Sequence, residues 1–99
     1  MASLSRALMN DFHVMRTVYQ ESENYAGTGM MDLAEDHADG ISKHHLPDRE
    51  YLQRMLDVLE SIKPMAHITP AEAEALDEAI AIVAGYQVKL EEYLASLSY

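Results

Sequence analysis

The residues best suited to chemistry form a group of acids and histidines in the middle of the chain. Carboxylate and imidazole groups are the usual protein ligands of zinc, iron and manganese. On a helix, successive side chains turn by about 100°, so the histidine inside the group points away from its acids. The group consists of Asp32, Glu35, Asp36, His37, Asp39, His44 and His45.

A metal-binding bundle that uses this cluster, Asp32 to His45, is therefore an alternative hypothesis. Di-metal carboxylate bundles carry Glu-x-x-His motifs on two inward faces, and the sequence contains no such motif. The favoured interpretation needs no metal and no cofactor. It treats the cluster as a solvated acidic face beside a polar loop that contains histidine.

Two further histidines, His13 and His67, are candidates for a general base because histidine titrates near neutral pH. No Gly-x-Ser-x-Gly or His-Glu-x-x-His signature accompanies them. The stretch Gly27-Thr28-Gly29 lacks the Lys-Ser/Thr pair of a phosphate loop and is interpreted as a break between helices. No catalytic residue is predicted, and the protein is not expected to be an enzyme.

Acidic side chains are concentrated between Gln20 and Ser42, where there are six acids and no Lys or Arg. The whole chain carries 17 Asp and Glu against seven Lys and Arg, a formal net charge of -10. Such a field repels nucleic acids and anionic membranes and attracts basic protein surfaces, including those that hold nucleic acid. The predicted partner-binding surface comprises Glu21, Glu23, Asp32, Glu35, Asp36 and Asp39.

The elements that must position these residues are helices. Thr69-Pro70-Ala71-Glu72 combines a capping box with proline at the first helical position, which predicts a helix running from there to about residue 97. Its apolar residues recur at alternating spacings of four and three, as in a helix that packs lengthwise in a bundle. The seam consists of Leu76, Ile80, Val83, Gln87, Leu90, Leu94 and Leu97, and only Gln87 breaks it.

Three more helices are predicted upstream. Helical periodicity favours one that begins at Leu4 and ends near Gly27-Thr28-Gly29. It favours another from Asp48 to Lys63, closed by Pro64. A short helix from Met30 to Asp39 would stop at Gly40, and residues 41–47 would be irregular. The short connection at residues 64–68 places the last two helices antiparallel. The predicted fold is all-α, a small antiparallel bundle of three long helices and one short helix, as a single domain over residues 1–99.

Two details of packing are also predicted. For the methionines, burial in the core is favoured over an interface; the alternative is that one of Met30 and Met31 is exposed to a partner, because adjacent residues cannot both face one core line on a helix. Ala81-x-x-x-Gly85 removes side-chain bulk and should allow close approach of another helix. A core this small makes a homodimer, or a structural homo-oligomer built on the last helix, a natural further expectation.

The chain contains no cysteine, which excludes disulfides and thiolate chemistry. It shows neither a signal-peptide segment nor a run of about 18 apolar residues, so a cytoplasmic protein is expected. In size, charge and helical build it resembles small phage-encoded inhibitors, including anti-CRISPR proteins and DNA mimics; this likeness carries over no residue. The expected function is a non-enzymatic acidic inhibitor or adaptor that docks on a basic surface of another protein.

Overall fold

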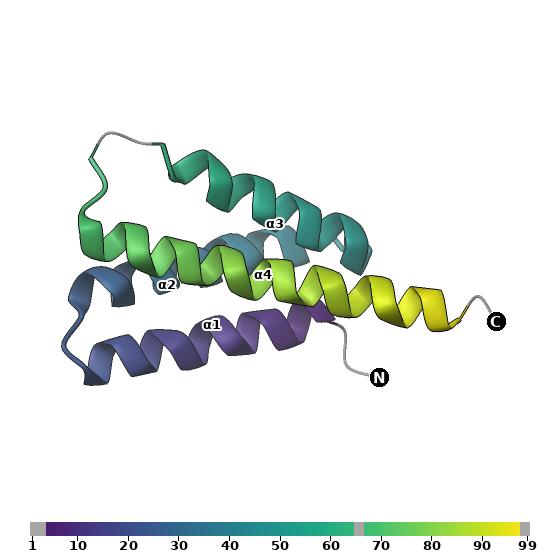
Figure 1. The fold of residues 1–99 in the computed structure, drawn as a ribbon, viewed down its shortest axis with the longest axis horizontal. Coiled ribbons are helices and arrows are strands. Elements are labelled where there is room, and N and C mark those ends of the chain that lie inside the picture. The colour runs from purple at the N-terminus through teal and green to yellow at the C-terminus, as the bar shows by residue number, and fades with distance from the viewer. Residues whose placement is uncertain (1–3, 65–66, 98–99) are drawn as a thin grey trace.

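The computed structural model describes residues 4–64 and 67–97 of the chain. Consecutive helices run in opposite directions, and the second and fourth pack together between the first and third (Figure 1). No strand occurs in the described residues. The predicted all-α antiparallel bundle is confirmed. Its helices are α1 (Leu4–Glu21), α2 (Tyr25–Ser42), α3 (Asp48–Ile62) and α4 (Pro70–Ser96).

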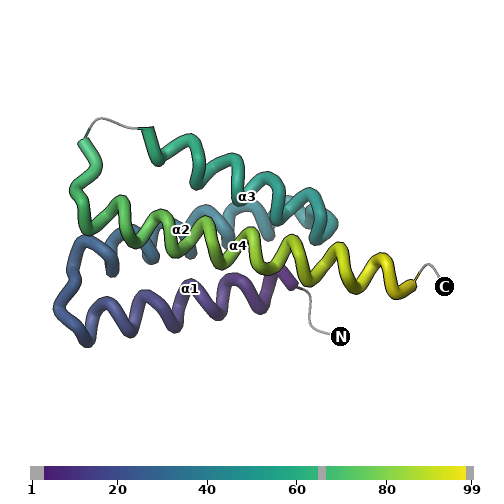
Figure 2. The backbone as a smooth tube through the Cα atoms, viewed as in Figure 1, coloured from purple at the N-terminus to yellow at the C-terminus, as the bar shows by residue number. Residues whose placement is uncertain are grey.

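Helix α4 begins as its sequence predicts. The Thr69 hydroxyl accepts a hydrogen bond from the Glu72 amide at 3.2 Å and donates one to the Glu72 carboxylate at 2.9 Å. The first of these bonds satisfies an amide that the first helical turn would otherwise leave unpaired, and the second holds the two side chains together. The helix spans 27 residues, and its last turns extend beyond the neighbouring ends of α1 and α3 (Figure 2).

Helix α2 differs from its prediction, because it is as long as α1 and contains all three glycines that were expected to flank or end it. Asn24 sets its first residue: the Asn24 side chain accepts a hydrogen bond from the Gly27 amide at 3.0 Å. No glycine in the described part of the chain has a positive φ. Packing against α1 and α4 outweighs the low helix propensity of glycine, so residues 27–29 continue the helix instead of breaking it.

One apolar cluster forms the core, and α2 lies at its centre. Met30 and Met31 are both buried, so the alternative that one of them is exposed was wrong. The reason is that α1 and α4 cover α2 from two directions, which leaves room for adjacent residues to be buried. The largest fully buried side chains are Leu8, Phe12, Met31, Tyr51, Leu52, Met55, Leu59, Leu76 and Val83.

The connections between helices are short. Glu23 and His45 adopt left-handed backbone conformations in the turns that follow α1 and α2. Asp48, the first residue of α3, accepts hydrogen bonds from the Leu4 amide and the Ser5 hydroxyl at 3.3 and 3.0 Å, which joins the start of α1 to the start of α3. Part of the predicted connection at residues 64–68, namely Met65 and Ala66, lies outside the described residues.

Candidate functional site

The six predicted acids lie on the last turn of α1, on the connection to α2, and along α2. Glu21, Glu23, Asp32 and Asp36 are exposed, whereas Glu35 and Asp39 are half-buried. The structure therefore spreads them along the length of α2 and gives them different surroundings.

Half of the predicted acids are compensated by basic groups. Arg16 on α1 places Nε 3.5 Å from Oε2 of Glu35 and Nη1 3.9 Å from Oδ1 of Asp32. Lys43 Nζ lies 3.1 Å from Oδ2 of Asp39, one turn along the chain. The sequence stretch free of Lys and Arg is therefore not free of positive charge in space.

The contact between Arg16 and Glu35 belongs to the packing of α1 on α2. The Nε of Arg16 and the Oε2 of Glu35 are both out of contact with solvent and make no hydrogen bond, so each depends on the other for compensation. His13 adds a contact, with Nδ1 3.5 Å from Oε1 of Glu35 and 3.1 Å from an Arg16 nitrogen. Glu35 is thus better suited to holding two helices together than to meeting a partner.

The remaining acids are uncompensated. Among the described residues, Glu21, Glu23 and Asp36 have no hydrogen-bond or ion-pair partner for their carboxylates. Tyr25, which opens α2 two residues after Glu23, leaves 71% of its surface exposed. An exposed aromatic ring beside uncompensated acids is typical of interface anchors.

The outward face of α2 carries a stripe with the spacing of a helix-packing seam. We call Gly29, Leu33, Asp36 and Gly40, which are all exposed, the outer stripe; its members are separated by four, three and four residues. The inward face repeats that spacing in Gly27, Met31, Ala34 and Ala38, all buried in the bundle. Of these two faces of α2, the bundle buries the inward one and leaves the outer stripe exposed.

The histidines of the metal hypothesis are dispersed. His37 is half-buried on α2, whereas His44 and His45 are exposed in the turns that follow the helix. Within residues 4–64 and 67–97, no group of three or more histidine, aspartate or glutamate side chains is placed to hold a metal ion.

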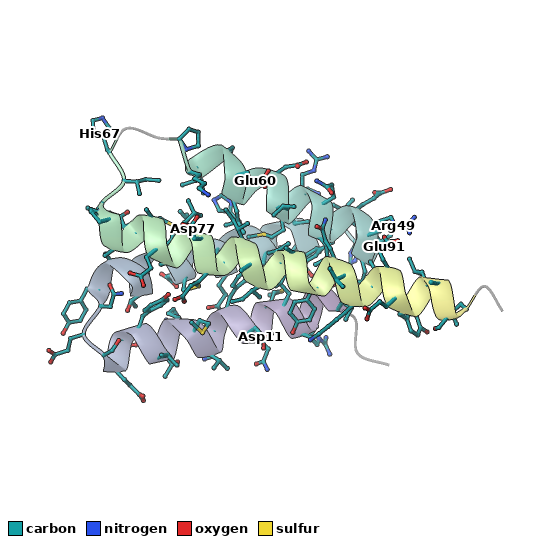
Figure 3. All side chains as sticks on the ribbon, viewed as in Figure 1. Asp11, Arg49, Glu60, His67, Asp77 and Glu91 are labelled. Carbon is teal, nitrogen blue, oxygen red and sulfur yellow. The ribbon has the colours of Figure 1, made fainter. Side chains whose placement is uncertain are left out.

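The two histidines considered as bases lie far apart along the bundle. His13 is exposed on α1 against Arg16, and His67 projects from the connection between α3 and α4 (Figure 3).

Within residues 4–64 and 67–97, no helix is both long enough and apolar enough to cross a membrane.

Two tyrosine–carboxylate pairs connect α1 with α4. The Tyr86 hydroxyl on α4 donates to Asp11 on α1, and the Tyr19 hydroxyl on α1 donates to Glu78 on α4. Burial, followed by the bond to Asp11 and its negative charge, raises the pKa of Tyr86 to about 12. Burial and Glu78 act on the pKa of Tyr19 in the same direction. Each pair therefore favours the protonated phenol.

A third tyrosine is held inside the core. The Tyr51 hydroxyl donates to the Ala38 carbonyl at 3.2 Å, which joins α3 to α2. Burial, with smaller contributions from the charges of Asp39 and Asp48, raises the pKa of Tyr51 to about 12. Deprotonation of this phenol would place a charge where only a carbonyl oxygen faces it.

These tyrosines predict that alkali unfolds the protein. Because the native pKa values of Tyr51 and Tyr86 lie above the usual value near 10, the unfolded chain loses protons first as the pH rises. Their contribution to the free energy of unfolding is fully present below about pH 10 and should be lost between about pH 10 and pH 12. The urea midpoint should therefore fall over that interval.

The urea midpoint, followed by circular dichroism at 222 nm, measures this effect. At pH 8, the urea midpoint of the Tyr51→Phe and Tyr86→Phe variants should be lower than or equal to that of the wild-type protein. From pH 10 to pH 12, the midpoint of each variant should decline less than the wild-type midpoint. An equal decline in all three proteins would contradict the assignment.

An open groove of about 630 Å³ lies between α3 and α4, in a region that sequence analysis did not single out. Arg49 on α3 forms two hydrogen bonds with the Glu91 carboxylate on α4, at 3.0 and 2.9 Å, and the two residues lie at the same end of the bundle (Figure 3). Two other residues that line the groove are also bonded: the Gln87 side chain donates to the Gln53 side chain at 3.1 Å. The polar break at Gln87 in the seam of α4 was the signal for this contact.

No other helix in the described part of the chain lies close to Gly85. A Cβ built at Gly85 has no atom within 4 Å, so that prediction was wrong for the described residues. Leu97, at the end of the predicted seam, is 63% exposed because α4 has passed the ends of its neighbours by then.

Comparisons with known proteins add no relative. No protein-family model, no curated protein and no solved structure matches this chain.

Proposed function

We propose that this protein is a non-enzymatic binding module, an inhibitor or adaptor, that docks through its acidic surface on a basic surface of another protein. The observation that carries the proposal is the uncompensated state of three exposed acids, namely Glu21 and Glu23 next to the exposed Tyr25 and Asp36 three turns along α2. A partner that normally holds nucleic acid offers the matching charge, and occupation of its site would inhibit it.

The charges and the ring have separate roles in such a complex. Exposed carboxylates in a protein of net charge -10 accelerate encounter with a basic surface and restrict which partners fit. Tyr25 supplies apolar area and a hydroxyl at low entropic cost, as tyrosine anchors do in protein interfaces. Affinity should therefore fall with salt and with loss of the ring.

The surface is narrower than the sequence predicts. Reversal of Glu35 would leave Arg16 without its partner inside the α1–α2 contact, so loss of binding could reflect a damaged fold. The carboxylates of Glu23 and Asp36 have no such partner within the bundle, so charge reversal at these two positions tests binding without damage to the fold.

The test compares two double charge reversals. Glu23→Lys with Asp36→Lys alters the proposed surface, whereas Glu60→Lys with Glu92→Lys alters exposed acids on α3 and α4. Both variants change the net charge equally, so any difference between them reports the location of the charge. Each is immobilised, and proteins captured from the native host lysate are measured by quantitative mass spectrometry.

The first variant should lose the partners captured by the wild-type protein, with affinity at least about tenfold lower, equivalent to about 1.4 kcal/mol. The second variant should retain them. Equal capture by both variants, or loss in both, would overturn the assignment of this surface.

A further inference from the structure

A second hollow lies where the chain turns from α2 into α3. It has a volume of about 430 Å³ and is open to solvent. Three half-buried aliphatic side chains line it: Ile41 near the end of α2, Leu46 in the turn and Val58 on α3. His44 and Arg54, both exposed, complete its wall. The hollow therefore combines an apolar lining with two nitrogen-bearing side chains that donate hydrogen bonds.

Arg54 has no partner within the described part of the chain. Every other Lys and Arg side chain there is in contact with a carboxylate, an aromatic ring or another group of the chain. Glu50 and Asp57 lie one turn before and one turn after Arg54 on α3, but neither forms an ion pair with it. Asp57 accepts instead from the Gln53 side chain at 3.0 Å. The guanidinium thus keeps its donors for a ligand.

The surroundings of Arg54 restrict the charge of that ligand. Glu50 and Asp57 line an adjoining hollow together with Arg54, so a dianionic group such as phosphate would be repelled by two carboxylates. A single carboxylate carries half that charge and matches the planar fork of one guanidinium. The aliphatic lining in turn favours a ligand with a hydrocarbon chain.

We propose that this hollow binds a small aliphatic monocarboxylate. The Arg54 guanidinium donates two parallel hydrogen bonds to the carboxylate oxygens, and the His44 imidazole donates a third. The hydrocarbon chain lies against Ile41, Leu46 and Val58. The volume falls in the range of about 300–1,000 Å³ that small-molecule sites occupy. This site goes beyond the proposed function, because it takes a small anion and needs no partner protein.

Four small probes test the proposal on the full chain. Hexanoate carries both the charge and the hydrocarbon chain, 1-hexanol lacks the charge, acetate lacks the chain, and hexylammonium reverses the charge. Titrations at neutral pH are followed by NMR through the methyl signals of Ile41, Leu46 and Val58. Hexanoate should shift these signals saturably and bind at least about tenfold more tightly than 1-hexanol or acetate. Hexylammonium should not bind, because Arg54 repels it.

Matched variants separate the role of Arg54 from the effect of net charge. Arg54→Gln removes the proposed carboxylate ligand, and Arg49→Gln makes the same change at another exposed arginine of α3, which contacts Glu91 instead. Arg54→Gln should weaken hexanoate binding at least about tenfold and leave 1-hexanol binding unchanged. Arg49→Gln should leave both unchanged. Circular dichroism checks that both variants keep the wild-type helix content.

Three results would overturn the proposal. The first is hexanoate binding no tighter than that of 1-hexanol, or no saturable shift at all. The second is equal weakening by Arg54→Gln and Arg49→Gln. The third is tighter binding of a short peptide that ends in a leucine carboxylate, lost when that end is amidated, which would assign the hollow to the chain end of a partner protein instead of a small acid.

Discussion

Phe12→Ala should remove a large part of the stability of this protein. Phe12 is fully buried on α1 and is the only phenylalanine of the chain. Truncation of a buried phenylalanine costs about 3–5 kcal/mol, through lost transfer free energy and the cavity that remains. A domain of this size has about 5–15 kcal/mol in total, so the thermal midpoint should fall by roughly 15 °C or more.

Val14→Ala is the matched control for that experiment. Val14 lies two residues away on the same helix but leaves half of its surface exposed, at 50%. Its truncation should change the free energy of unfolding by less than about 0.5 kcal/mol. Urea unfolding followed by circular dichroism compares the two variants. A loss of similar size in both would show that α1 does not pack on the bundle through the face that contains Phe12.

Gly27→Ala should destabilise the protein although alanine is the better helix former. The added Cβ would meet the Tyr19 ring at 2.9 Å and the Asn24 side chain at 3.0 Å. Neither neighbour is free to move, because Tyr19 is bonded to Glu78 and Asn24 caps α2. Overpacking of this kind costs about 1–3 kcal/mol, more than the gain of about 1 kcal/mol in helix propensity.

Gly29→Ala, two residues further along the same helix, should have the opposite sign. Its Cβ would enter open space, so only the propensity gain of up to about 1 kcal/mol remains. Thermal unfolding of the two variants side by side measures the difference. If Gly27→Ala stabilised the protein as much as Gly29→Ala does, the close contact between α1 and the start of α2 would be wrong.

The sequence by itself determined the parts of the fold that depend on local chemistry. The capping residues Thr69 and Glu72 and the proline at residue 70 placed the start of α4, and the Thr69 hydroxyl accepts from the Glu72 amide as the motif predicts. Pro64 and the periodicity before it bounded α3 to within one residue. These signals are readable because caps and prolines act within one helical turn, whatever the rest of the chain does.

Only the tertiary structure decided the extent of α2. The local sequence around its glycines predicts breaks in the helix. The low helix propensity of these glycines is offset by burial of Met30, Met31 and Ala34 against two neighbouring helices. No window of the sequence contains that information, since the helices that cover α2 lie before and after it in the chain.

For the candidate site too, the sequence determined one part and the tertiary structure determined the other. The sequence located the acids and their net field, which depend only on composition and order. It could not show that Arg16, from α1, compensates Glu35, or that the exposed acids Glu23 and Asp36 remain uncompensated. Coulomb energy depends on distance through space, and the antiparallel return of α2 along α1 sets those distances.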